Sequence, residues 1–216
     1  MGDPAPAGRR GSVRSADQTL TAKGHATKAR LLSAARDALH RRGELEIAEV
    51  AEAAGVAQSV IHRYFTNKAG LVEAVVHEFY DSYDDVVFLA PLAPNATWTE
   101  REQLRIQLEV SFLYDHPLGP RVAAGLIHEA AATRVDAQRQ RQHAAMASRN
   151  IRRGQEAGEL PHHVNADLAG AAIIGALRSV LAAALSLDEP PSREEVAATV
   201  TRLSLALLRD EPPTPA

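Results

Sequence analysis

The feature that most restricts the fold of this chain is a very short helix-forming segment at residues 57–64, which follows an Ala-Ala-Gly-Val corner ending at Val56. Gly55 can take the left-handed backbone conformation that a tight turn after a helix requires. A helix of two turns is unstable unless neighbouring helices hold it in place. Ile61 and Phe65 can pack it against two preceding helices. The segment therefore predicts a small unit in which two helices support a third.

Helical spacing of apolar residues continues along most of the chain, and almost no strand pattern interrupts it. The sequence therefore predicts an all-α fold of about nine helices. Cap and stop signals place them at residues 27–42 with Thr27 as the N-cap, 47–54, 57–64, 68–87 after Asn67, from a capping box at Thr97–Glu100 or Thr99–Glu102 to Asp115, from the Pro117–Pro120 break to Ala132, 134–157, from Asn165 or Asp167 to Leu187, and 193–208 after Ser192.

Composition excludes several classes of protein. The chain of 216 residues contains no Cys, which rules out disulfides, thiolate nucleophiles and Cys-based metal centres. No phosphate loop, nucleophile elbow or metalloprotease His pair is present, and His162 and His163 are adjacent, as in a solvated loop. We therefore expect no enzyme activity, no cofactor and no metal site.

Charge is divided unevenly along the chain. Residues 1–70 hold 11 Lys and Arg against 7 Asp and Glu, a net +4, and the remainder holds 13 against 20, a net −7. Such a split also arises by chance, but it suits a basic part that faces phosphates beside an acidic body. The expected division is a disordered basic arm (1–24), a basic N-terminal domain (25–72), an acidic body (73–210) and a disordered tail (211–216).

One segment, Leu168 to Leu187, is nearly continuous in apolar residues and about long enough to span a bilayer. Arg178 lies near its middle and many of its residues are Ala or Gly, which contribute little transfer free energy. We therefore expect a buried helix of a cytoplasmic protein rather than a membrane span.

The side chains expected on the outer face of the short helix suit contacts with DNA. Gln58 can pair with adenine and Arg63 with guanine, and Ser59 and His62 can meet several base edges. Lys68 begins the next helix, where free amides attract phosphate, and the Tyr64 hydroxyl can reach phosphate too. The alternative is an exposed face without any partner.

These residues carry a family resemblance. The phrases "ATKARLLSAARDALHRRG" and "VAEAAGVAQSVIHRYFTNKAGL" resemble the DNA-binding domain of the tetracycline-repressor (TetR) family over Thr27 to Val76. A looser likeness covers Ile151 to Leu177. The resemblance implies an all-helical homodimer that binds operator DNA and that a small molecule releases from it. It assigns DNA binding to residues 25–72, and effector binding and dimerisation to residues 73–210. The DNA-binding set is then Thr27, Gln58, Ser59, Val60, His62, Arg63, Tyr64 and Lys68.

The chain departs from the family pattern at a few positions. Ala57 replaces a common Ser or Thr, His62 stands where Tyr is frequent, and Ala69 replaces a common acidic residue. Glu46 occupies a place where Ser or Thr often touches phosphate, and a carboxylate there would repel DNA. The phosphate contact at this position is therefore not expected.

The rest of the chain gives two less specific expectations. The last two helices are expected to form the dimer interface, with an internal core hairpin as the alternative, through Gly170, Ile174, Leu177, Leu181, Val196, Val200, Leu203 and Leu207. A ligand pocket is expected in the body, although ordinary core residues would look alike, at Phe88, Trp98, Phe112, Tyr114, His116, Ile127, His128, Met146 and Ile174. Alternatives to a ligand-responsive repressor are a regulator that answers to a protein partner or to nothing and, remotely, an all-helical enzyme or carrier.

Overall fold

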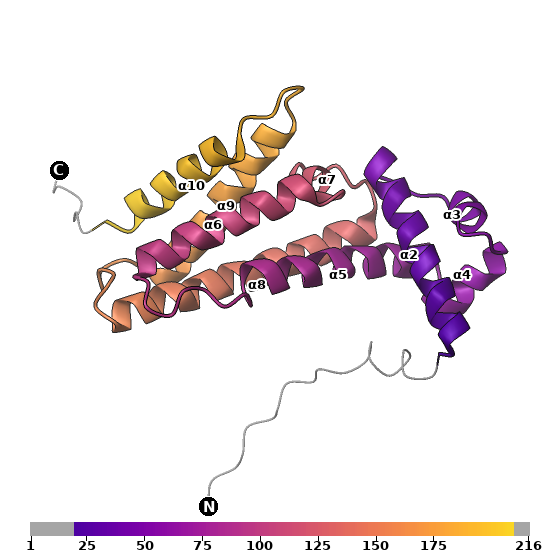
Figure 1. Cartoon of the computed structure of the whole chain (residues 1–216), viewed down its shortest axis with the longest axis horizontal. Helices are drawn as coiled ribbons and strands as arrows, with labels where there is room; N and C mark the ends of the chain where they lie inside the picture. The colour runs from indigo at the N-terminus through magenta and orange to yellow at the C-terminus, as the bar shows by residue number, and fades with distance from the viewer. Residues whose placement is uncertain (1–19, 210–216) are drawn as a thin grey trace, which may run out of the picture.

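A computed structural model of the chain describes residues 20–209, and all regular structure in this range is helical, as the sequence predicts. Three helices form an N-terminal unit at one end of the molecule, and the others form an elongated body (Figure 1). The N-terminal unit contains α2 (Ala22–Arg42), α3 (Ile47–Ala53) and α4 (Gln58–Phe65); the body contains α5 (Lys68–Val87), α6 (Trp98–Asp115), α7 (Gly119–Ala123), α8 (Ala130–Glu156), α9 (Ala166–Leu185) and α10 (Arg193–Leu207).

The first helix starts earlier than predicted. Thr21, not Thr27, is the N-cap of α2, and its hydroxyl oxygen accepts a hydrogen bond from the Gly24 amide at 3.2 Å. Apart from Gly24 in the first turn, no Gly or Pro follows until Gly43, and the helix includes residues 22–24, which the sequence assigned to the arm. The rest of the expected arm, residues 1–19, and the expected tail, residues 211–216, lie outside the described residues.

Most of the other helix ends lie where their capping signals predict. Gly43 ends α2 with φ of +77°, and its amide donates to the Leu39 carbonyl oxygen at 2.9 Å. Asn67, Asn165 and Ser192 cap α5, α9 and α10 through their side chains. Of the two boxes that could open α6, only Thr97–Glu100 is used, because the Glu102 side chain is buried in the body.

The region after α6 differs from the prediction. One long helix was expected to reach Ala132, but α7 has only five residues and ends near Gly125, whose φ is +67°. The chain then passes beside the end of α2, where the His128 amide donates to the Gly43 carbonyl oxygen at 2.7 Å, and α8 begins at Ala130. A contact with a distant part of the chain therefore breaks the helix that local periodicity predicts.

One continuous apolar core joins the N-terminal unit to the body. Leu31, Leu39 and Ile61 are fully buried in the same cluster as Leu71 and Val75 of α5, which extends from one part into the other. Within residues 20–209, α9 is the helix that is long and apolar enough to cross a membrane, and a third of its most apolar window is buried. That inner face packs against α8 and α10. The rest of α9 is left open.

Candidate nucleic-acid interface and ligand cavity

The short helix α4 separates its residues cleanly into an inner and an outer face. Ile61 and Phe65 are buried, as predicted, and α4 packs against α3 and α5. Because the outer residues are spaced by one helical turn, they share one face. All four are exposed: Gln58, Ser59, His62 and Arg63.

The remaining members of the expected DNA-binding set are not on this open face. Val60 and Tyr64 are half-buried and pack against the core. Thr27 is buried inside α2, where its hydroxyl donates to the Lys23 carbonyl oxygen at 2.9 Å. The N-cap role expected for Thr27 is therefore wrong, and its hydroxyl is already engaged within its own helix.

Lys68 begins α5 and is held by two carboxylates. Its ammonium nitrogen lies 3.0 Å from Oε1 of Glu129 and 3.6 Å from Oε1 of Glu46. Burial alone would lower the pKa of Lys68, but the hydrogen bond and charge of Glu129, together with Glu46, raise it. Glu129 precedes α8 in the body, so a residue of the body neutralises a lysine beside the exposed face of α4. No local sequence pattern indicates this pair, because its members are far apart in the chain.

The same segment of the body holds the end of α2. The Arg121 guanidinium donates to the carbonyl oxygens of His40 and Arg41, and the His40 ring nitrogen lies 2.6 Å from the Pro117 carbonyl oxygen. Glu129 also accepts a hydrogen bond from the Leu45 amide at 3.2 Å. We call these contacts, between residues 40–45 and residues 117–129, the joint.

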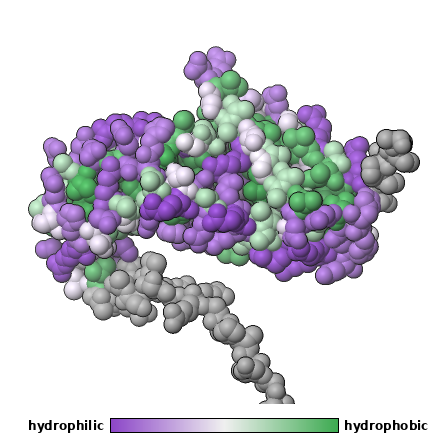
Figure 2. Space-filling model, turned by 180° about the vertical axis from the view of Figure 1, so that it is seen from behind, coloured by the Kyte–Doolittle hydropathy of each residue, from purple (hydrophilic) through white to green (hydrophobic). Residues whose placement is uncertain are grey.

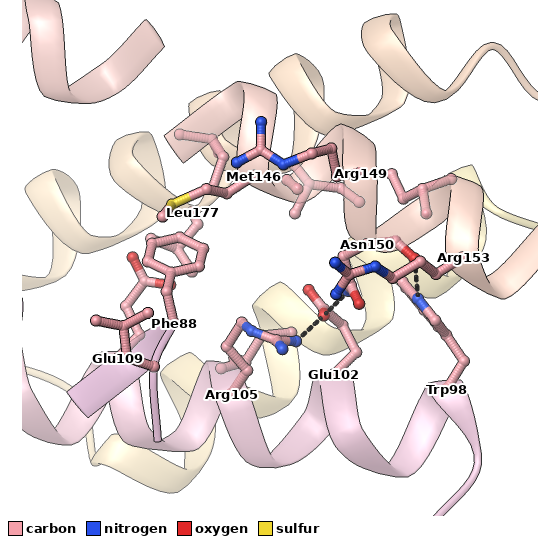
Figure 3. Close-up of a pocket in the computed structure, with 16 residues that line it drawn as sticks. Phe88, Trp98, Glu102, Arg105, Glu109, Met146, Arg149, Asn150, Arg153 and Leu177 are labelled. Carbon is pink, nitrogen blue, oxygen red and sulfur yellow. Dashed lines mark hydrogen bonds and ion pairs between the residues drawn. The ribbon is translucent and has the colours of Figure 1, made fainter. Parts of the chain in front are cut away.

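The body encloses a cavity of about 240 Å³ between α6, α8 and α9 (Figure 3). Four residues expected in a pocket line it: Phe88, Trp98, Met146 and Ile174. Ile106, Ile173 and Leu177 supply further apolar wall. The cavity thus joins residues from helices that are distant in the sequence.

Two carboxyl groups that the sequence analysis missed stand in the wall of this cavity. Glu102 and Glu109 are both buried, and a separation of seven residues places them on the same face of α6. The sequence offered one sign of these carboxyl groups, because both glutamates lie on the inner, otherwise apolar stripe of this helix.

The environments of the two carboxyl groups differ. Oε2 of Glu102 accepts from Arg105 at 2.7 Å and from Asn150 at 3.1 Å. Oε1 of Glu109 accepts from the Tyr83 hydroxyl, and no cation is bonded to Glu109 among the described residues. Burial raises the pKa of both groups, to about 8 for Glu109, although the Tyr83 hydrogen bond opposes the rise.

Several residues expected in the pocket lie elsewhere. Phe112 stacks on His116 with ring centroids 5.2 Å apart, and the Tyr114 hydroxyl donates to the Pro191 carbonyl oxygen. His128 is an exposed residue of the joint. None of these four lines the cavity, because each packs against α5, α10 or α2. Ile127 lines a second cavity, of about 180 Å³, beside Arg121 and Arg178.

Most of the residues expected at a dimer interface belong to the core of the chain itself. Five of them are buried: Gly170, Leu177, Leu181, Val196 and Val200. At Gly170 an added Cβ would lie 2.7 Å from the backbone nitrogen of Ser148, so this glycine allows α9 to approach α8. Ile174 lines the first cavity. Only Leu203 and Leu207 remain exposed, at 47% and 43%.

Comparison with known proteins places the N-terminal unit in a family. Residues 31–75 match the family model for bacterial regulatory proteins of the tetR family. The transcriptional regulator TtgR of Pseudomonas putida and the probable regulator ArpR of the same species are each 37% identical over 60 residues, 27% of this chain and 29% of theirs. The N-terminal unit belongs to the TetR family. The alignment spans less than a third of the length of these relatives.

Solved structures match the fold over most of the chain. The regulator FadR of Bacillus subtilis, in complex with stearoyl-CoA, is 17% identical with a TM-score of 0.68, over 84% of this chain and 99% of FadR. A tetR-family protein from Rhodococcus RHA1 is 18% identical with a TM-score of 0.65, over 84% of this chain and 96% of that one. At these identities the likeness establishes the fold of the body and not its ligand.

Proposed function

We propose that this TetR-family protein is a sequence-specific DNA-binding regulator of transcription in the cytoplasm, a repressor that a small molecule releases from a palindromic operator. The observation that carries the proposal is the exposed polar face of α4, which a buried core and the joint hold at one end of the molecule. A helix presented in this way fits the DNA major groove.

Each exposed residue of α4 has a distinct role in the proposed complex. Arg63 pairs with guanine and Gln58 with adenine, and Ser59 and His62 contact neighbouring base edges. Tyr64 and Lys68 contact phosphates. Lys68 must exchange Glu129 for a phosphate to do so, which makes its contact conditional on the body.

A palindromic operator requires two copies of the chain related by a two-fold axis. The open face of α9 and α10 suits this homodimer, because Leu168, Leu203 and Leu207 are all exposed on it. Green, apolar surface runs over this side of the body in Figure 2. Around Gly175 nothing lies within 4 Å of an added Cβ, so a second helix can approach closely. The interface proposed here therefore uses the outer residues of α9 and α10.

The two cavities support a small-molecule effector and suggest how it acts. A space of about 40 Å³ shares Glu109, Ile174 and Leu177 with the first cavity and Tyr80, Val122 and Arg178 with the second. The second cavity also touches Arg121, which holds the end of α2. A ligand that moves these walls would shift the joint, and therefore α4, away from the position that DNA requires.

The decisive experiment is selection of random duplex DNA by the purified protein, followed by binding of the enriched duplex in a salt series. We expect an inverted repeat and a steep fall of affinity with salt. Arg63→Ala should weaken binding to the enriched duplex by roughly 10- to 100-fold and relax one base position, as loss of a bidentate contact does. A folded dimer that enriches no sequence and binds no duplex at low salt would refute the proposal.

A further inference from the structure

The walls of the first cavity restrict the chemistry of what it can hold. Its apolar surface comes from Phe88, Ile106, Ile173, Leu177 and Met146. Its volume of about 240 Å³ lies below the ~300–1,000 Å³ of sites for drug-sized molecules. A ligand of this cavity is therefore small and largely apolar, such as one ring with a short chain.

Both buried glutamates offer this cavity an oxygen that the protein does not use. One oxygen of Glu109 accepts from Tyr83, and one oxygen of Glu102 accepts from Arg105 and Asn150; the second oxygen of each takes no hydrogen bond from the described residues. Between residues 20 and 209, no fully buried side-chain oxygen or nitrogen lacks a partner. The two unused oxygens therefore reach open space, and both residues line the cavity. Figure 3 shows both side chains extending from α6.

The positive charges around the cavity do not neutralise Glu109. Arg105 is paired with Glu102 at 2.7 Å. Arg149 and Arg153 are exposed residues of α8, where water and salt screen their charge. A buried carboxyl group without a cation is costly, and a cation brought by a ligand removes that cost.

We infer that this cavity binds a small apolar organic cation, a protonated amine whose nitrogen is held by the unused oxygen of Glu109 and whose apolar part extends past Phe88 toward Trp98. The two aromatic rings add attraction for a cation that passes their faces. This inference rests on the proposed function only in making the cation the effector; the binding site itself does not depend on DNA.

The inferred complex has a defined proton balance. An ammonium ion that enters beside a protonated Glu109 forms an ion pair when the carboxyl proton leaves to solvent. Binding near neutral pH should therefore release up to one proton, because burial keeps Glu109 protonated in the free protein. Tyr83, Glu102 and Arg105 are the titratable neighbours that influence Glu109.

Three matched probes test the inference by titration calorimetry on the full chain: 4-phenylbutylamine, 4-phenylbutanol and 4-phenylbutyrate. We expect the amine to bind at least about tenfold more tightly than the other two, since only the amine can make a charge-assisted hydrogen bond to the carboxylate. Titrations in buffers of different ionisation enthalpy should give the proton release. Glu109→Gln should weaken the amine by about tenfold or more and abolish proton release while leaving the alcohol unchanged. The control is Glu156→Gln, which alters an exposed glutamate of α8 outside the cavity.

Three results would overturn the inference: no binding of the amine, an amine affinity unaffected by Glu109→Gln, or preferred binding of the butyrate that Arg149→Gln and Arg153→Gln abolish. Binding of the selected duplex tests the proposed function separately from binding of the amine. If the amine binds as described but does not release DNA, the site stands and the effector role fails. If no duplex is selected, the proposed function fails while calorimetry still decides the chemistry of the cavity.

Discussion

The N-terminal unit and the body place their polar side chains in opposite ways. On α4 the polar residues Gln58 and Arg63 face solvent, on a helix whose apolar residues are buried behind them. In the body, buried and half-buried polar groups bind one another: Arg178 is paired with Asp136, and Glu109 is bonded to Tyr83. The first arrangement presents polar side chains to an external partner. The second places polar side chains where a molecule that enters the body can contact them.

The joint connects these two kinds of structure and is unusually dependent on backbone contacts. Arg121 donates to the carbonyl oxygens of His40 and Arg41, and the His128 amide donates to that of Gly43. Contacts with backbone atoms fix the position of a helix end more directly than contacts between flexible side chains. Whether the two parts can act on each other therefore depends on the rigidity of the joint. The largest predicted effect tests that rigidity.

We expect Gly43→Ala to destabilise the protein more than any other single change discussed. Gly43 has φ of +77°, and an added Cβ would lie 2.1 Å from the Leu126 carbonyl oxygen. Gly125 provides a matched control because its φ is +67° and nothing lies within 4 Å of an added Cβ. Gly125→Ala should lose only the backbone term, about 1–2 kcal/mol, and Gly43→Ala about 1–3 kcal/mol more for the collision. Urea unfolding measures both, and equal losses would mean that the joint yields easily.

The N-terminal unit could be predicted from the sequence more fully than the body. The exposed residues of α4 were predictable because Gly55, Ile61 and Phe65 define that helix through local spacing. The path of residues 126–129 was not, because it depends on Gly43, which is distant in the chain. The pairing of Lys68 with Glu129 has the same origin.

The spacing of apolar residues also did not predict which part of the protein covers each apolar face. Leu181 and Val200 belong to regular apolar stripes, and the sequence assigned them to a dimer interface, but the chain buries both within itself. The less apolar outer side, with Leu168 and Gly175, is the open one. In the cavity only apolar members were predicted, and the position of Glu102 and Glu109 on the apolar stripe of α6 was the one local sign of its two carboxyl groups.

The buried polar groups of the body predict a stability that declines on both sides of mildly acidic pH. Burial raises the pKa of Glu109 from 4.5 to about 8, so the folded state keeps a proton that the unfolded state loses, and stability falls as the pH rises through this window. Burial, aided by Arg36, lowers the pKa of His116 from 6.5 to about 4, so stability also falls as the pH drops from 6.5 through 4.

Glu109→Gln should reduce the loss of stability at alkaline pH and leave the loss at acidic pH unchanged. A pKa difference of one unit corresponds to about 1.4 kcal/mol, and we expect the variant to gain at least that much stability over the parent near pH 8, and little near pH 5. Thermal or urea unfolding across the range measures the gain. The same gain in Glu156→Gln, or none in either variant, would show that Glu109 does not govern the alkaline limb, and would weaken the contrast between an internally polar body and an outwardly polar N-terminal unit.

The smallest predicted effect tests whether the body restrains the N-terminal unit electrostatically. Glu129→Gln removes the charge that holds Lys68 but keeps an oxygen for the Leu45 amide. Because Lys68 is 37% exposed, the pair is worth less than about 1 kcal/mol, so operator affinity should rise only about two- to fivefold. Fluorescence anisotropy with the selected duplex measures it. If the rise persists in the Lys68→Ala background, Glu129 acts through general repulsion of DNA; if it disappears there, the body sets the availability of one phosphate contact, and the two parts are coupled by charge as well as by the backbone contacts of the joint.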